Sequence, residues 1–176
     1  MKQAKNNNIF LVGPMGAGKS SVGRYLAKQL GMDFYDTDEE VEKRTGVDLA
    51  WIFDVEGEDG FRKREAAVVV DLAKLSNVIL ATGGGTIITP ENRDILAARG
   101  AIIYLEVALE HQHTRVVNDS RRPLLRVKNR DEVLVKLQHE REPHYEALAD
   151  FKVQTDNRSV RAVADDIIHW LSGKSR

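Results

Sequence analysis

The sequence predicts an α/β protein with a three-layer α/β/α arrangement, in which helices cover both faces of a central, mostly parallel sheet of five strands. Short apolar runs rich in Val, Ile and Leu alternate with amphipathic stretches along the chain. The 176 residues contain no internal repeat and no Pro-, Gly- or Ser-rich linker, so we expect one domain over residues 1–176. Alternating strands and helices form parallel sheets, whose ligands lie beyond the carboxyl ends of the strands.

Five short runs are expected to be strands. Two of them, Val78–Ala81 and Ala101–Glu106, are too short for buried helices and carry β-branched Val or Ile. In chain order the expected strands are Asn8–Val12, Asp33–Asp36, Val78–Ala81, Ala101–Glu106 and Phe151–Gln154. The chemistry is therefore expected just after these runs.

Five stretches between the strands are expected to be helices. The first, Lys19–Leu30, places Val22 and Leu26 on one face and stops at Gly31. The others are Phe61–Leu75, Glu91–Arg99, Asp131–Leu148 and Val160–Leu171. Pro143 is expected to kink or end the fourth of them, because proline lacks the N–H that a helix interior needs.

The composition argues against several classes of protein. Lys and Arg total 26 against 27 Asp and Glu, and this balance is untypical of nucleic-acid or membrane-surface binders. The absence of cysteine excludes disulfides and Cys-based zinc sites. Residues 1–8 carry no apolar signal core, and no apolar run could span a bilayer. We expect a cytoplasmic protein without nucleic-acid or membrane partners, and a monomer because no apolar seam is evident.

The segment Gly13–Ser20, GPMGAGKS, matches the phosphate-binding pattern GxxxxGK[ST] in full. Its glycines let consecutive backbone amides face one oxyanion, and the following helix adds its positive end. Lys19 is expected to reach the outer phosphates of a nucleoside triphosphate, and the Ser20 hydroxyl to bind Mg²⁺. The loop identifies a triphosphate site but not the reaction.

Two acidic residues, Asp36 and Asp38, follow the second expected strand. Alternation along an extended segment would point both carboxylates the same way. Asp36 would then suit the hydration shell of Mg²⁺, and Asp38 would suit accepting a proton from an attacking hydroxyl. The structural alternative is that Asp38, followed by two glutamates, caps a helix. Ala81-Thr82 stands where a Walker B acid would lie, which favours Asp36 for the metal.

Glycines and arginines supply the remaining candidates. Gly83–Gly85 follow the third expected strand and fit either a ligand that approaches bare backbone or a simple turn. Arg62 opens an expected helix, Arg122 lies in a polar segment over 117–128, and Arg141 lies on a later helix. Arginine suits bidentate recognition of carboxylate and phosphate, although a single arginine is more often a solvated surface charge.

These motifs together resemble shikimate kinases from Asn8 to about Leu171. The resemblance rests on the order and spacing of GPMGAGKS, DTD, FRKRE, GGG, RRPLL and REPHY, which begin at residues 13, 36, 61, 83, 121 and 141. It implies a P-loop fold like that of nucleoside monophosphate kinases. It also implies ATP-dependent phosphorylation of the 3-hydroxyl of shikimate with Mg²⁺ as cofactor, in the biosynthesis of chorismate and the aromatic amino acids.

The resemblance assigns the ATP side of the site. It implies ATP contacts from Gly16, Ala17, Gly18, Lys19, Ser20 and Ser21. Mg²⁺ is expected at Ser20 and, through water, at Asp36. Arg115 is expected to pack on adenine, with Arg158 close to the base.

The resemblance also assigns the acceptor side and the catalytic groups. It implies shikimate contacts from Asp38, Arg62, Gly83, Gly84, Gly85 and Arg141. A substrate-binding subdomain is expected at about 38–61 and a lid at about 117–128. Arg122 is expected to close with the lid over the transferring phosphate. The expected catalytic residues are Lys19, Asp38 and Arg122.

Two other functions fit the same motifs. One is another small-molecule kinase of this architecture, such as a gluconate kinase. The other is a nucleotide-binding module without an acceptor, although no NKxD guanine signature supports a GTPase.

Overall fold

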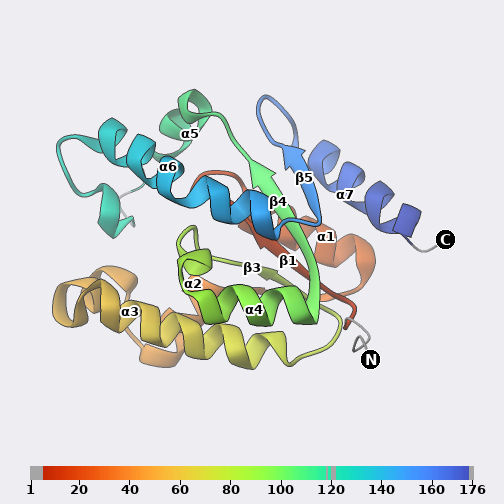
Figure 1. Cartoon of the computed structure of the whole chain (residues 1–176), viewed down its shortest axis with the longest axis horizontal. Coiled ribbons are helices and arrows are strands. Elements are labelled where there is room, and N and C mark those ends of the chain that lie inside the picture. The colour runs from red at the N-terminus through yellow and green to blue at the C-terminus, as the bar shows by residue number, and fades with distance from the viewer. Residues whose placement is uncertain (1–5, 118, 120–121, 175–176) are drawn as a thin grey trace.

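Five parallel strands form one sheet in the computed structural model, which describes residues 6–117, 119 and 122–174 (Figure 1). The strand order is β2-β3-β1-β4-β5, and every neighbouring pair is parallel. The strands are β1 (Asn8–Val12), β2 (Asp33–Asp36), β3 (Val78–Ala81), β4 (Gly100–Glu106) and β5 (Phe151–Gln154). The predicted five-stranded sheet is confirmed, and β4 begins one residue earlier than expected.

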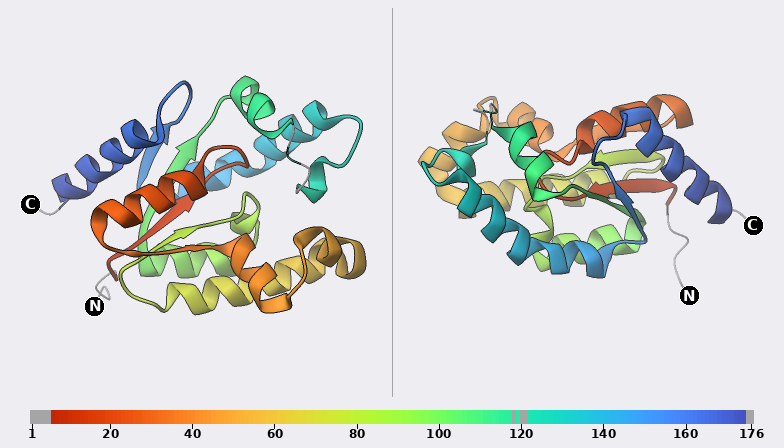
Figure 2. Two further views of the ribbon diagram at one scale, coloured as in Figure 1. Left: turned by 180° about the vertical axis from the view of Figure 1, so that it is seen from behind. Right: turned by 90° about the horizontal axis from the view of Figure 1, so that it is seen from above.

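Helices cover both faces of the sheet, as the view from above shows (Figure 2). The α-helices are α1 (Lys19–Leu30), α2 (Thr37–Thr45), α3 (Leu49–Ala73), α4 (Pro90–Arg99), α5 (Leu109–Val116), α6 (Arg130–Leu148) and α7 (Val160–Lys174). Two short 3₁₀-helices are η1 (Thr86–Ile88) and η2 (Pro123–Leu125). The predicted three-layer α/β/α architecture is therefore confirmed.

The core consists of two apolar layers, one on each face of the sheet. In β1, Ile9 and Leu11 pack into the layer that holds α1 and α7, while Phe10 and Val12 pack against α3 and α6. All four side chains are almost fully buried. A strand buried on both faces reads as a continuous apolar run, which explains the sequence NIFLV.

Helix α3 is longer than predicted. The sequence indicates Phe61–Leu75, but the helix starts at Leu49, where Asp48 caps it by accepting a hydrogen bond of 2.8 Å from Trp51 N. Gly57 interrupts the helical geometry with a φ of 72° and a ψ of 179°. The glycines and acidic residues around this break hide the helical period. Helix α2 and the first part of α3 make up the region predicted as a substrate-binding subdomain.

Helix α6 passes through Pro143 and ends at Leu148. The sequence predicted a kink or an end at this proline, and the helix does not end there. Pro143 leaves the carbonyl of His139 without its usual helical donor. Among the described residues, no helix combines the length and apolar character that a membrane crossing requires.

Candidate active site

The phosphate-binding sequence forms a loop between β1 and α1, and close contacts explain its glycines. Gly13 has a φ of 145°, and a Cβ there would lie 2.3 Å from the carbonyl oxygen of Leu105. Gly16 has a φ of 78°, and its Cβ would lie 2.9 Å from a methyl group of Val116. Any other residue would be strained at both positions. The glycines thus let the loop pack closely against Leu105 at β4 and Val116 on α5.

Lys19 is the buried cation of this loop. Its Nζ donates hydrogen bonds to the carbonyl oxygens of Gly13 at 2.6 Å and Pro14 at 2.8 Å. The pKa of Lys19 is lowered to about 7. Burial is the largest cause and Arg122 contributes in the same direction, while the carboxylates of Asp38 and Asp36 oppose the shift. The site therefore holds an ammonium group that an additional anion would stabilise.

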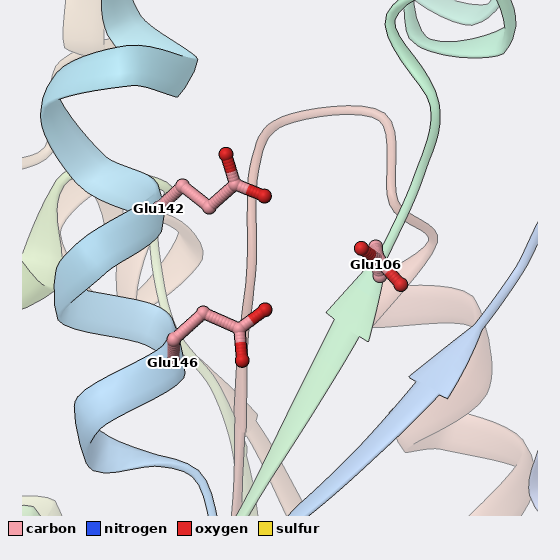
Figure 3. Close-up of side chains that lie close together, drawn as sticks. All are labelled: Glu106, Glu142 and Glu146. Carbon is pink, nitrogen blue, oxygen red and sulfur yellow. The ribbon is translucent and has the colours of Figure 1, made fainter.

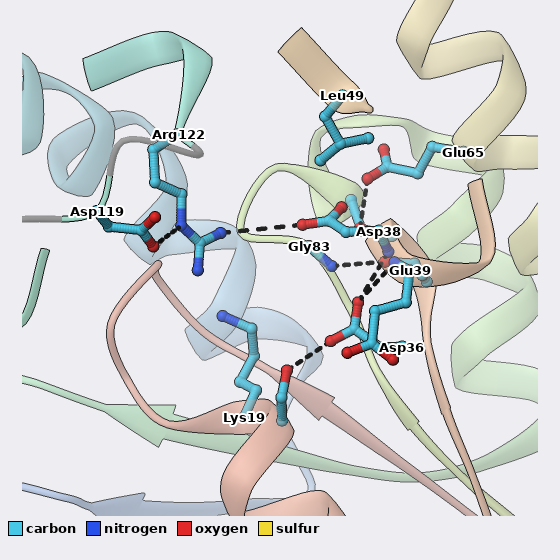
Figure 4. A network of polar contacts seen from close by, with 12 residues as sticks. Lys19, Asp36, Asp38, Glu39, Leu49, Glu65, Gly83, Asp119 and Arg122 are labelled. Atoms are coloured by element: carbon cyan, nitrogen blue, oxygen red, sulfur yellow. Dashed lines mark hydrogen bonds and ion pairs between the residues drawn. The ribbon is translucent and has the colours of Figure 1, made fainter. Parts of the chain in front are cut away.

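Asp36 joins the phosphate loop to α2 (Figure 4). Its Oδ2 accepts a hydrogen bond of 2.5 Å from the Ser20 hydroxyl, and its Oδ1 accepts from the backbone N–H of Asp38 at 2.9 Å and of Glu39 at 3.2 Å. Asp36, not Asp38, is thus the cap of α2. The extended geometry predicted through Asp38 is wrong, because the chain turns into the helix at Thr37.

Asp38 lies in the first turn of α2 and lines the same cavity as Lys19. The pKa of Asp38 is raised to about 7. Burial is the largest cause, and repulsion from Asp36 and Glu65 contributes in the same direction. Arg122 and Lys19 act in the opposite direction. The side chain is still 26% exposed, so this carboxyl group is open to a proton donor from the cavity.

Arg122 faces Asp38 from the other side of the cavity (Figure 4). Its Nη1 lies 3.9 Å from Asp38 Oδ2, and its Nε donates to Asp119 Oδ2 at 3.2 Å. Within the predicted lid, Asn118, Ser120 and Arg121 lie outside the described residues.

A buried ion pair underlies the arginine at the start of the FRKRE motif. Arg62 donates to Glu65 Oε1 at 2.9 Å, and Glu65 is fully buried. The other oxygen of Glu65 accepts from the Thr86 hydroxyl at 2.8 Å. A Cβ on Gly85 would lie 2.2 Å from Nη2 of Arg62, which explains why this position has no side chain.

Arg141 comes to the glycine loop from α6. It is 4% exposed, and its Nη1 lies 3.3 Å from the place that a Cβ on Gly84 would take. Burial lowers the pKa of Arg141, and its Nε has no hydrogen-bond partner. The Tyr145 hydroxyl donates to the carbonyl oxygen of Gly84. The three glycines make room for the protein's own arginines and carboxylates as well as for a turn.

These groups line two adjoining cavities. The cavity at the glycine loop has a volume of about 470 Å³ and is lined by Met15, Asp38, Leu49, Phe53, Phe61, Arg62, Glu65, Gly83, Gly84, Gly85, Arg122, Pro123, Leu124 and Arg141. The cavity at the phosphate loop has a volume of about 680 Å³ and is lined by Gly16, Gly18, Lys19, Ser20, Ser21, Asp36, Asp38, Thr82, Gly83, Gly84 and Arg122. Asp38, Gly83, Gly84 and Arg122 line both, so the two cavities meet at these four residues.

Arg115 and Arg158 line neither cavity. Arg115 donates to the carbonyl oxygen of Gly16 at 2.9 Å and to that of Thr155 at 3.0 Å, so it lies at the edge of the phosphate loop. Arg158 forms an ion pair of 2.7 Å with Asp166 on α7. The structure therefore brings Arg115, but not Arg158, against the phosphate loop.

Four polar side chains support the site and were not predicted. Glu65 holds Arg62 three residues away, and Tyr145 lies four residues after Arg141; both spacings place the pairs on one helix face. Thr37 accepts a hydrogen bond of 2.9 Å from Gly83 N. Gln112 on α5 donates to the carbonyl oxygen of Met15 at 2.9 Å. The helical spacings were detectable in the sequence, whereas the other two contacts depend on the fold.

A separate acidic group lies between β4 and α6 (Figure 3). In the described part of the chain, the carboxylate oxygens of Glu106, Glu142 and Glu146 lie within 4.8 Å of one another. The ammonium of Lys152 on β5 lies 2.8 Å from Glu146 and 3.9 Å from Glu106. These ion pairs link α6 to the sheet. The acidic group is separate from Ser20 and Asp36, the predicted metal ligands.

The fold and the site define a P-loop phosphotransferase. A phosphate loop follows the first strand of a parallel α/β sheet, and an acceptor cavity with two arginines adjoins it at an aspartate. This combination places a polyphosphate next to a small acidic acceptor.

The comparisons identify the family. The family model of shikimate kinase matches residues 15–172. Shikimate kinases from Buchnera aphidicola and Legionella pneumophila are 55% and 52% identical over 170 and 174 residues, covering 96% and 99% of this chain and 98% and 99% of theirs. A solved shikimate kinase from Acinetobacter baumannii, in complex with shikimate, aligns with a TM-score of 0.94 and 43% identity over 96% of this chain and 94% of that chain. The chain belongs to the shikimate kinase family, and the predicted resemblance and enzyme class are confirmed.

Proposed function

We propose that the chain transfers the terminal phosphoryl group of ATP to the 3-hydroxyl of shikimate. ATP binds over Gly16–Ser21, and shikimate binds in the cavity of Arg62, Arg141 and Gly83–Gly85. The observation that carries this proposal is that the two cavities meet at Asp38 and Arg122. A phosphate donor and a hydroxyl acceptor bound in these cavities would be neighbours at this pair.

On the donor side, the loop amides and Lys19 bind the phosphates. Burial is the main cause of the lowered pKa of Lys19, Asp38 and Asp36 offset it in part, and phosphate oxygens would add further negative charge. Ser20 and Asp36 fit Mg²⁺, because they present hard oxygen donors only 2.5 Å apart beside the loop. Ser20 would hold the ion directly and Asp36 through water. Bound Mg²⁺ neutralises charge on the outer phosphates.

On the acceptor side, Arg62 and Arg141 bind the shikimate carboxylate. Each charge-assisted hydrogen bond contributes about 1.5–3 kcal/mol. The two guanidinium groups lie against the glycine loop, Arg62 beside Gly85 and Arg141 beside Gly84. Phe53 and Phe61, with ring centroids 4.8 Å apart, supply an apolar wall for a carbocyclic ring. This wall and the two cations together favour a cyclic acid over a linear one.

The transfer step needs a proton acceptor and a counter-charge. Asp38 accepts the proton from the acceptor hydroxyl, and its pKa of about 7 suits a general base at neutral pH. Lys19 and Arg122 stabilise the charge that shifts to the leaving oxygen. An arginine in the position of Arg122 contributes on the order of 10³ in rate.

We also propose that the segment 117–128 is a lid and that 38–61 is a substrate-binding subdomain of a single domain. Arg122 is 33% exposed and already faces Asp38, so a short movement would enclose the phosphoryl group. Hydrogen exchange over 117–128 should slow when both ligands bind. Unchanged exchange would count against a lid.

The proposal also covers the adenine side of the ATP site, the oligomeric state of the protein and its location. Arg115 packs on adenine, because it lies at the rim of the phosphate loop. Arg158 lies close to the base in this proposal. The balanced net charge of −1 argues against nucleic-acid partners. We propose a monomeric, cytoplasmic enzyme. Light scattering of the purified protein tests the monomer.

The release of ADP tests the proposed reaction. We expect fast release from Mg·ATP with shikimate, and slow release with gluconate, with other hydroxy acids or without an acceptor. Turnover with gluconate at the rate of shikimate would indicate a different acceptor. Slow hydrolysis that no acceptor accelerates would indicate a nucleotide-binding module instead.

A further inference from the structure

Tyr145 is a buried tyrosine between the acceptor cavity and the sheet. It is 1% exposed and lies one helical turn after Arg141 on α6. Its ring stacks on Tyr104 of β4, with centroids 5.1 Å apart and an angle of 27°. This packing fixes the place of the phenol ring, and so directs its hydroxyl.

The hydroxyl of Tyr145 connects two parts of the acceptor site. It donates a hydrogen bond to the carbonyl oxygen of Gly84, 61 residues earlier in the chain. Tyr145 also interacts electrostatically with the Arg141 guanidinium, whose Nη1 lies 3.3 Å from the place that a Cβ on Gly84 would take. A hydroxyl can donate and accept at the same time, so one group orders both the glycine loop and the arginine.

Arg141 has few other restraints near the cavity. Its Nε has no hydrogen-bond partner among the described residues, although Arg141 is 4% exposed. Arg62, by contrast, is held by ion pairs with Glu65 at 2.9 Å and Glu58 at 3.2 Å. Tyr145 therefore interacts with Arg141 where carboxylates interact with Arg62.

We propose that Tyr145 is a positioning residue for the acceptor. Its hydroxyl orients the guanidinium of Arg141 and the backbone of Gly84 before the acceptor binds. This inference rests on the proposed function, in which Arg141 binds the shikimate carboxylate. Groups held in place in advance lose less conformational freedom when a ligand arrives, and binding is tighter for that reason.

The variant Tyr145→Phe tests the inference, because it removes one oxygen and keeps the stacked ring. We expect shikimate to bind about tenfold more weakly in calorimetry, while Mg·ATP affinity changes by less than about twofold. In steady-state assays KM for shikimate should rise more than kcat falls. Tyr104→Phe is the matched control, since it removes a hydroxyl from the other ring of the same stacked pair, and we expect parental affinity for both ligands.

Arg141→Ala in the same titrations separates the possible outcomes. Loss of shikimate binding in Arg141→Ala together with parental binding in Tyr145→Phe would overturn only the role of Tyr145. Unchanged shikimate binding in Arg141→Ala would overturn the proposed function itself. Equal losses for shikimate and Mg·ATP in Tyr145→Phe would show that the hydroxyl supports the fold in general, and would also overturn the inference.

Discussion

The phosphate-loop cavity and the acceptor cavity share lining residues, among them Asp38 and Arg122, but are built in different ways. The phosphate loop takes its chemistry from consecutive backbone groups and from Lys19, all within Gly13–Ser20. The acceptor cavity takes its chemistry from side chains on α3 and α6 that converge on the glycine loop after β3. One is a local arrangement of main chain, and the other is a product of the fold.

This difference shows in how the charged groups are held. Lys19 is held by carbonyl oxygens and is short of anionic partners, so it is prepared for a polyanion. Arg62 is already paired with the buried Glu65, and so is less dependent on a ligand for its charge balance. Arg62 is thus balanced in charge before a ligand arrives, whereas Lys19 and the buried Arg141 would gain from an added anion. If this is right, substitutions in one half should leave binding to the other half intact.

The largest effect should come from Lys19→Met in the donor half. We expect kcat for ADP release to fall by roughly 10⁴-fold, about 5.5 kcal/mol in the barrier, with shikimate affinity unchanged. The thermal midpoint should not fall. Burial in the folded protein holds the pKa of Lys19 below its ordinary value, so the charged lysine lowers the stability below about pH 7. This loss of stability is relieved as the pH rises above that value. Turnover near that of the parent would remove Lys19 from the mechanism.

Arg122→Ala acts where the two halves meet. We expect kcat to fall on the order of 10³-fold, with small changes in the affinity for either ligand alone. Single-turnover kinetics on the ternary complex would check this. A loss that appears in KM for ATP only would make Arg122 a nucleotide-binding residue and not part of the transfer step.

The pH dependence of Asp38 provides the third test. The value of kcat/KM for shikimate should fall about tenfold per pH unit below about pH 7, because the proton acceptor must be ionised. Asp38→Asn should lower kcat by about 10²-fold and abolish this limb. A limb that persists in Asp38→Asn would assign the titration to another group.

The same pKa predicts a change in stability. The pKa of Asp38 is higher in the folded protein, so its contribution favours folding at low pH and is lost as the pH rises from about 3.8 to about 7. Asp38→Asn should therefore raise the melting temperature relative to the parent more at pH 8 than at pH 5, by about 2–4 °C for each kcal/mol recovered. An equal difference at both pH values would contradict the raised pKa.

Gln112→Leu should have a smaller effect that is confined to the donor half. It removes the hydrogen bond to the Met15 carbonyl but keeps the volume of a buried side chain. We expect KM for ATP to rise about fivefold, with KM for shikimate unchanged. A shift in KM for shikimate alone would mean that α5 supports the other half.

Arg158→Ala should have the smallest effect. Its guanidinium forms an exposed ion pair with Asp166, and such pairs contribute little. We expect KM for ATP to change by less than about threefold. A tenfold rise would show that Arg158 leaves Asp166 to contact the nucleotide.

The sequence predicted the donor half well, because its requirements are local. A strand, eight loop residues and a helix follow one another, and the glycines are required by backbone geometry at Gly13 and Gly16. The strands β1, β3 and β4 were predictable for the same reason, since short runs buried on both faces have a plain apolar signature. Asp36 was assigned beside Ser20, although its capping of α2 was not predicted.

The acceptor half was predictable only through family resemblance. No local pattern joins Gly84 to Tyr145, which are 61 residues apart, and the contact follows from the placement of α6 over the end of the sheet. The role of Glu65 depends on full burial, which its sequence context of charged residues does not indicate. The first part of α3 was missed because Gly57 breaks its period.

Titration calorimetry of both ligands into Lys19→Met and Arg141→Ala tests most directly whether the two halves bind independently. The account predicts that Lys19→Met keeps shikimate binding and loses Mg·ATP affinity, and that Arg141→Ala shows the reverse. Loss of both ligands in either variant, with the fold intact by circular dichroism, would contradict it.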